Sequence, residues 1–252
     1  MAELATAVTL DILQHGELEI EGLLPWSSNY TFMMQVCGSD ADDSPLVLQA
    51  VYKPRRGERP LWDFAQGTLC LRERAAFLVS NALNWHIVPP TVLRKAAHGF
   101  GSIQLFIEHD PERHYFTFEG EPAYRTQLQK FVLFDILINN ADRKSGHVLL
   151  QENMEPPERL WGIDHGICFH QEYKLRTVIW EFVGQSIPTD LIRGLRHIQT
   201  LLETDGSELT SQLQNLLSTA EIAAMHRRVN HLIQQGTFPA PGPGRHYPWP
   251  PV

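Results

Sequence analysis

The chain has 252 residues, 43% of them hydrophobic and 20% charged, which is ordinary for a globular protein with one sizeable core or two small lobes that share a cleft. Its formal net charge of −8 argues against sequence-independent nucleic-acid binding, which needs a basic surface to replace counterions. The chain has three cysteines without a CxxC pair, and its N-terminal stretch has no basic residues. It also lacks an apolar run of roughly 20 residues. We therefore predict a cytoplasmic protein with no transmembrane segment.

The first half of the chain is predicted to be rich in strands. Apolar and polar residues alternate in GELEIEGLL and again in LVLQAVYKP, which is the period of a half-buried strand, whereas TLCLRERAAFLVSNAL has the apolar stripe of a helix. The expected order is a short helix at 1–14, two strands within 16–37, a strand at 46–54, a helix at 68–83, a strand within 85–94 interrupted by Pro89 and Pro90, and a strand at 100–108.

The second half is predicted to be mostly helical. FVLFDILINN (131–140) is an apolar helix, and HVLLQE and RLWGID are short strands. Helical periodicity returns at 188–203, 207–217 and 218–236, and the last of these helices opens with a capping box from Ser218 to Glu221. Residues 237–252 are rich in proline and are predicted to be an extended, polyproline-like tail.

A sheet-rich half followed by a helix-rich half predicts an α+β fold with two lobes. We place the N-lobe at 1–108, the C-lobe at 109–236 and the tail at 237–252, with a hinge at Phe106–Glu112. Phe106 and Ile107 of this hinge are candidate nucleotide contacts.

Two candidate phosphate contacts lie in the predicted N-lobe. The turn PWSSNYTF carries Ser27, Ser28 and Asn29, whose hydroxyls and backbone N–H groups suit phosphate oxygens, although an ordinary hairpin turn has the same composition. Lys53 ends an apolar strand and shares a face with Val51, so its ammonium group is a candidate phosphate ligand and Val51 a candidate base contact. A lysine at a strand end in solvent is the alternative.

Three carboxylates complete the candidate site. Glu73 lies on the following helix, where a carboxylate can hold a phosphate-binding lysine, although Arg72 and Arg74 beside it also fit a solvated charged face. Asp142 follows an apolar helix in NNADRKSGHVLL, and Asp164 follows a strand in WGIDHGICF. Phosphoryl transfer needs one carboxylate at the acceptor hydroxyl and one at the metal that bridges the phosphates. Gly166 is expected to permit the turn after Asp164.

At these residues the chain resembles the phosphatidylinositol 3-/4-kinase superfamily, and within it the bacterial, type II phosphatidylinositol 4-kinase-like proteins of an actinobacterial-type subgroup. The stretches that carry the resemblance are VYKP, LRERAAFLVSNAL with VPPT, NNADRKSGHVLL and GIDHGICF, in that order. It implies a two-lobed protein-kinase-like fold, a small antiparallel sheet in the N-lobe and a mostly helical C-lobe. It also implies that ATP and Mg²⁺ or Mn²⁺ are the cofactors.

By the same resemblance, Lys53 contacts phosphates, Glu73 orients Lys53, Asp142 and Arg143 form the catalytic motif and Asp164 binds the metal. The chain departs from the family pattern at His147, which stands where a metal-binding asparagine is expected. An imidazole is a poor ligand for Mg²⁺ and a better one for Mn²⁺, and it can also act in proton transfer. A zinc site of His147, His165 and His170 is an alternative, although the spacing fits no common zinc pattern.

The function predicted from the sequence is ATP-dependent transfer of the terminal phosphate to a hydroxyl of an unidentified lipid, protein or small molecule. Two alternatives use the same residues: a nucleotide-binding pseudokinase or scaffold, and an enzyme that transfers adenylate. The tail suggests a further role, either as a ligand for a peptide-binding partner or as a lid that folds across the cleft.

Overall fold

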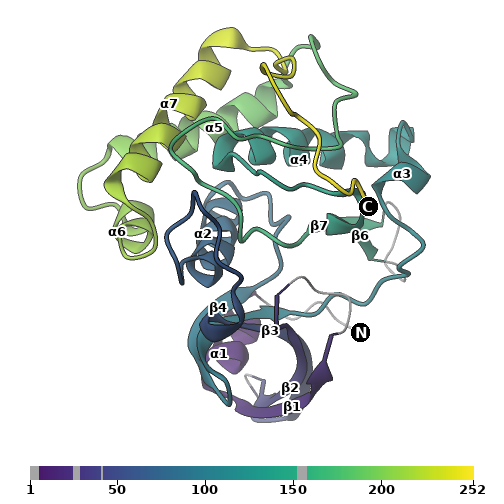
Figure 1. The fold of residues 1–252 in the computed structure, drawn as a ribbon, viewed down its shortest axis with the longest axis vertical. Helices are drawn as coiled ribbons and strands as arrows, with labels where there is room; N and C mark the ends of the chain where they lie inside the picture. Colours follow the sequence, from purple (N-terminus) through teal and green to yellow (C-terminus); the bar gives the residue numbers. More distant parts are fainter. Residues whose placement is uncertain (1–5, 25–28, 41, 152–157) are drawn as a thin grey trace.

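The computed structural model describes residues 6–24, 29–40, 42–151 and 158–252, and it has the predicted two-lobed, kinase-like architecture (Figure 1). The N-lobe is built on an antiparallel sheet with the strand order β1-β2-β3-β5-β4. The strands are β1 (Glu17–Leu23), β2 (Phe32–Ser39), β3 (Pro45–Pro54), β4 (Thr91–Ala96) and β5 (Gly99–Leu105).

Burial alternates along β3, as the sequence predicted. Leu48, Ala50 and Tyr52 are buried on one face, while Val51 and Lys53 lie on the other. The buried face packs with Ile12 and Leu13 of α1 (Thr6–His15) into a small core of its own. Leu48, Ala50 and Tyr52 fill this core from one face of the strand, so the side chain of Lys53, on the other face, is directed away from the core.

Helix α2 (Leu69–Ala82) joins the two lobes. Its residues Ala75 to Val79 belong to the large hydrophobic core of the C-lobe, yet the helix also contacts β4 and β5. Figure 1 shows α2 between the sheet and the helices of the C-lobe. Because Arg72 and Glu73 are only 3% exposed, the solvated charged face considered for this helix is wrong.

The C-lobe surrounds α4 (Arg125–Ile138), a helix whose residues from Phe131 to Ile138 are all buried. This complete burial explains why the residues here are apolar on all sides of the helix, with Asp135 as the exception, and do not form a stripe. The other elements are α3 (Tyr115–Phe118), the hairpin of β6 (Val148–Gln151) and β7 (Arg159–Gly162), α5 (Thr189–Glu203), α6 (Glu208–Gln214) and α7 (Thr219–Gln235). Short 3-10 turns lie at Arg55–Gly57, Pro122–Tyr124 and Ser145–His147.

Several boundaries differ from the prediction. The strand expected within 85–94 begins only at Thr91, because Pro89 and Pro90 have no N–H to donate to a sheet. The helix expected at 131–140 begins at Arg125, and α3 was not predicted. The lobe boundary at residue 108 stays a prediction; it falls in the connection between β5 and α3.

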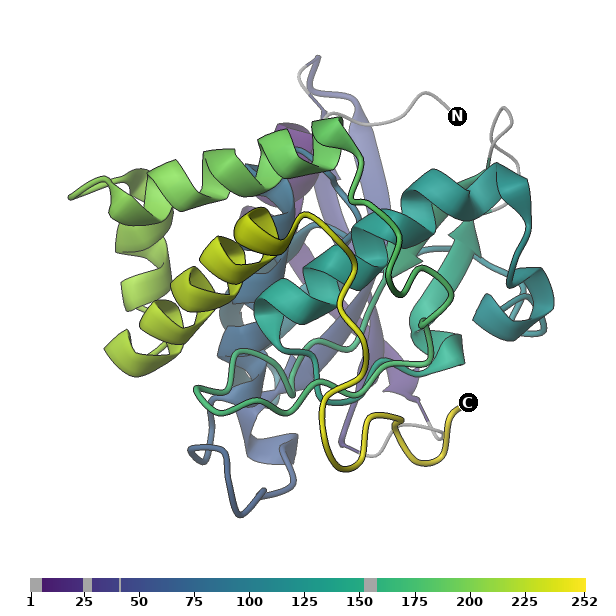
Figure 2. The same ribbon diagram turned by 90° about the horizontal axis from the view of Figure 1, so that it is seen from above.

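The capping box of α7 is present, since the Ser218 hydroxyl accepts a bond from the Glu221 N–H and the helix ends at Gly236 in the left-handed conformation. Beyond it, residues 237–252 form a strap that runs along the C-lobe towards β6 (Figures 1 and 2). Phe238 is buried against Phe182, and the carbonyl of Pro251 accepts a 2.9 Å bond from the N–H of Ser145. The tail therefore packs on its own C-lobe.

Candidate active site

Lys53 connects two carboxylates that are far apart in the sequence. Its Nζ lies 2.5 Å from Oε1 of Glu73 and 2.9 Å from Oδ1 of Asp164. Burial alone would lower the pKa of Lys53, but the charges of Asp164 and Glu73 outweigh it and raise the pKa, so the ammonium stays charged. The structure thus brings together three of the residues that the sequence singled out.

Asp164 lies two residues after the end of β7 and has an unusual backbone conformation. Its φ of 59° is in the left-handed region, and its side chain is 46% exposed. The turn predicted at Gly166 is present at residues 166–167, and the N–H of His165 before it donates to Oε2 of Glu73 at 3.0 Å. The charge of Lys53 holds the pKa of Asp164 well below its ordinary value, so this carboxylate is ionised at neutral pH.

Asp142 lies in the loop after α4 and is held through its backbone. Its N–H donates to the side-chain oxygen of Asn140 at 3.0 Å, and its carboxylate lies 3.9 Å from Nζ of Lys144. Burial raises the pKa of Asp142 to about 6, opposed by the nearby positive charge of Lys144. A carboxylate with a pKa near neutrality is suited to accepting a proton from an acceptor hydroxyl.

His147 lies between the two aspartates. Its Nδ1 is 2.9 Å from the carbonyl oxygen of Asp142 and 3.5 Å from the backbone nitrogen of Lys144. We assign the ring proton to Nδ1 from the shorter contact, because only a protonated Nδ1 can donate to a carbonyl. Burial lowers the pKa of His147 to about 4, so the ring is neutral and Nε2 carries a lone pair. This Nε2 faces Oδ2 of Asp164 at 3.3 Å. Two electron-pair donors therefore face each other, an arrangement that a cation between them would stabilise.

This donor set fits a divalent cation that receives its other ligands from phosphate oxygens and water. The described residues contain no cluster of three or more His, Cys, Asp or Glu side chains able to hold a metal by themselves. The zinc alternative is disfavoured, because His165 is fully buried beside Arg143 and His170 bonds the carbonyl of Asp63.

Arg143 is buried, and its side-chain bonds go to groups other than the carboxylates of Asp142 and Asp164. Its guanidinium pairs with Asp135 at 2.9 Å, and its Nη1 donates to the carbonyls of His147 and Ile163 at 3.0 Å each. These two bonds fix the backbone at His147 and directly before Asp164. Arg143 was predicted as part of the catalytic motif; the geometry gives it a positioning role inside the protein.

A small apolar cluster lies between the lobes, and it contains a residue that the sequence had singled out. Ile107, which is 4% exposed, packs with Leu149 and Trp161, and Leu105 and Ile163 border the cluster. Neighbouring Phe106 donates its N–H to the carbonyl of Gln49. Leu149 and Trp161 were missed. Their only signal was that each stands in a short apolar strand, one of which follows the loop with Asp142 while the other precedes Asp164.

The predicted phosphate-covering turn is described only in part. Ser27 and Ser28 lie outside the described residues. The side-chain oxygen of Asn29 accepts a 2.9 Å bond from the N–H of Arg59, so this amide oxygen ties the turn to the loop after β3.

Comparison with known proteins places the chain in a family. Residues 90–232 match the family described as phosphatidylinositol 3- and 4-kinase. Protein Rv2133c of Mycobacterium tuberculosis (strain ATCC 25618 / H37Rv) is 35% identical over 95% of this chain and 94% of its own length. Phosphatidylinositol 4-kinase gamma 4 of Oryza sativa subsp. japonica is 28% identical over 48% of this chain, which corresponds to 24% of the plant protein.

Solved structures agree at the level of the fold. A hydra Fam20 structure with sugar superposes with a TM-score of 0.57 at 17% identity, covering 90% of this chain and 86% of that chain. The Helicobacter pylori proinflammatory kinase CtkA gives a TM-score of 0.51 at 12% identity, with 90% and 94% covered. No described helix is both long and apolar enough to cross a membrane. From the extent of the family match and the similarity to Rv2133c, the chain belongs to the phosphatidylinositol 3- and 4-kinase family.

Proposed function

We propose that the protein is an ATP-dependent phosphotransferase that moves the terminal phosphate of ATP to a hydroxyl group. The observation that carries the proposal is the ion-paired Lys53, which is held by buried Glu73 and reaches the exposed carboxylate of Asp164. A fixed ammonium group next to an ionised carboxylate suits a phosphate chain and the cation that accompanies it.

Each residue has a role that its surroundings support. Lys53 binds phosphate oxygens, and Glu73 orients Lys53. Asp142, whose pKa is raised to about 6, orients the acceptor hydroxyl and accepts its proton. Asp164 and the lone pair on Nε2 of His147 hold the divalent metal, which supplies charge neutralisation at the phosphates. The nitrogen ligand favours Mn²⁺ over Mg²⁺.

The base of the nucleotide is assigned to the apolar cluster between the lobes. Ile107, Leu149 and Trp161 provide apolar surface there, with Val51 on the cleft-facing side of β3. Ser27, Ser28, Asn29 and Phe106 remain proposed nucleotide contacts. A structure of the Golgi casein kinase with Mn/ADP bound superposes with a TM-score of 0.51 at 18% identity, covering 91% of this chain and 74% of that chain. It supports the proposal that this fold binds a nucleotide and a divalent metal.

The test compares wild-type protein with Asp142→Asn and Asp164→Ala in turnover of ATP with Mg²⁺ or Mn²⁺. Asp142→Asn keeps the shape of the side chain, and we expect it to lower turnover by about 100-fold or more because it cannot accept a proton. Asp164→Ala should lower turnover and also reduce the thermal stabilisation that an ATP analogue with Mn²⁺ produces. Asp205→Ala, at an exposed position, serves as the matched control.

The outcomes separate the alternatives. Unchanged turnover in Asp164→Ala would contradict the proposal. A nucleotide-dependent rise in melting temperature without any turnover would identify a non-catalytic nucleotide binder, the role considered because His147 replaces the expected amide. Intact-mass analysis after incubation with ATP distinguishes phosphate transfer from adenylate transfer, because the added masses differ.

A further inference from the structure

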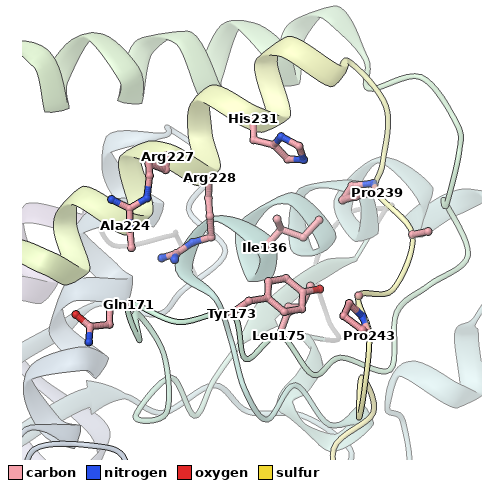
Figure 3. A pocket seen from close by; sticks show the side chains of 12 residues that line it. Ile136, Gln171, Tyr173, Leu175, Ala224, Arg227, Arg228, His231, Pro239 and Pro243 are labelled. Carbon is pink, nitrogen blue, oxygen red and sulfur yellow. The ribbon is translucent and has the colours of Figure 1, made fainter.

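A second cavity lies in the C-lobe, apart from Lys53, Asp142 and Asp164. Its volume is about 530 Å³, within the range of pockets that hold small organic ligands. Figure 3 shows its walls: α7 on one side, the strap with Pro239 and Pro243 on the other, and Ile136, Tyr173 and Leu175 between them. The strap therefore closes one side of this cavity.

The wall of the cavity has two chemical characters. Ile136, Leu175, Ala224 and the strap prolines offer apolar surface, whereas α7 contributes Arg227, Arg228 and His231. None of the twelve lining residues is acidic, although the whole chain carries a net charge of −8. Cations thus collect here against the overall charge of the protein.

Arg227 and Arg228 form no ion pair with a described residue. Arg228 donates Nε to the carbonyl of Leu137 at 2.9 Å, and its buried Nη2 has no hydrogen-bond partner. Burial lowers the pKa of Arg228 to about 10, and the charge of Arg227 adds to the effect. His231 likewise forms no ion pair within the described part of the chain. A buried cation without a counter-charge is costly, whereas Arg227 and His231 are exposed at the rim and accessible to an anionic ligand.

We propose that this cavity binds a small amphipathic carboxylate, with its apolar body against Ile136, Leu175 and the strap prolines and its carboxylate at Arg227 and His231. The two exposed rim groups supply one permanent positive charge and one hydrogen-bonding ring, which suit a monoanion. This site is separate from the proposed phosphotransfer site, and its test does not depend on turnover.

The binding test uses octanoate, with 1-octanol as a neutral probe of the same chain length. In calorimetric titrations at pH 7, octanoate should bind the wild-type protein more tightly than octanol. Arg227→Ala should weaken octanoate binding about tenfold, the value of one charge-assisted hydrogen bond, and leave octanol binding unchanged. Arg196→Ala, which removes an exposed arginine of α5 outside the cavity, should change neither.

Two further measurements fix the location. Octanoate should shift the methyl resonances of Ile136 and Leu175, and Ala224→Leu, which fills part of the cavity, should weaken both probes. The melting temperature of Ala224→Leu shows whether that variant is folded. If it is not, Arg227→Ala still tests the role of the positive charge, because Arg227 is exposed. The proposal is overturned if octanoate binds no tighter than octanol, if Arg196→Ala weakens it as much as Arg227→Ala, or if the two methyl groups do not respond.

Discussion

Neighbouring charged residues in the loop after α4 have opposite surroundings. Asp142 keeps its side chain 27% exposed, whereas Arg143 beside it is completely buried and paired with Asp135. His147, four residues further on, directs one ring nitrogen to the carbonyl of Asp142 and the other to Asp164. In this loop, Asp142 and His147 therefore face the proposed reaction site, whereas Arg143 holds the backbone in place.

The three cysteines give a prediction at the same scale. Burial and the charge of Glu58 raise the pKa of Cys70 to about 12, and burial raises the pKa of Cys168 well above its ordinary value. Only the thiolate reacts readily, so both should resist disulfide reagents in the folded protein, while half-buried Cys37 reacts. Titration with a chromogenic disulfide at pH 8 should detect one thiol per native chain and three in denaturant.

Cys37→Ser provides the control, since it should abolish the reaction of the native protein without changing the reactivity of the other two thiols in denaturant. Rapid reaction of a second thiol in the native protein would contradict the burial described here.

The element that most extends the sequence prediction is the strap. Its residues are rich in proline and form no helix or strand, as expected. Yet His246 accepts a 3.1 Å bond from the N–H of Thr177, and Pro251 accepts one from the N–H of Ser145. The strap thus contacts the loop that carries Asp142 and His147 from the side of the C-lobe.

Removal of residues 244–252 should therefore loosen this loop. Both acceptors are lost, while Pro239 to Pro243 and the cavity wall that they form remain. We expect faster hydrogen exchange at the amides of Ser145 and Thr177, measured by NMR, because they lose their acceptors. The amide of Val178, which donates to the carbonyl of Arg143, should exchange as before. Equal exchange at all three amides in the two proteins would show that the strap does not hold the loop.

In the whole molecule, the ion pair of Asp63 with Lys174 joins the two lobes, in addition to α2 and the pair of Lys53 with Asp164. Oδ2 of Asp63, in the loop before α2, lies 2.9 Å from Nζ of Lys174, and the ring of His170 bonds the carbonyl of Asp63. Both side chains of the pair are more than four-fifths buried. This contact ties the N-lobe loop to the segment that follows Asp164.

Asp63→Asn should lower the free energy of unfolding by about 2 kcal/mol at pH 7, because a hydrogen-bonded charge pair is lost. The bond with Lys174 lowers the pKa of Asp63 against the opposing effect of burial. A lowered pKa gives stability that is complete above the unfolded value, which is about 3.9, and is lost at lower pH. The difference between wild type and variant in urea unfolding should thus be constant above about pH 5 and shrink below pH 4.

Asp205→Asn, at an exposed position between α5 and α6, is the control for a general effect of one carboxylate on acid stability. A difference between wild type and Asp63→Asn that grows as the pH falls would contradict the assigned ion pair.

The sequence by itself determined most of the elements and the order of the candidate residues. Period-2 alternation set the face of β3 on which Lys53 lies, and apolar runs and caps located α2, α4 and α7, because these signals are local. It also identified Lys53, Glu73, Asp142 and Asp164 as candidates. Only the tertiary structure decided that Lys53, Glu73 and Asp164 meet, that Arg143 is buried and that Leu149 and Trp161 join Ile107. Such contacts depend on long-range packing, which chain spacing does not encode. The position of the strap, and the cavity that it borders, were likewise decided by the tertiary structure. A proline-rich segment has no internal hydrogen bonds and takes its position from the surface that it contacts.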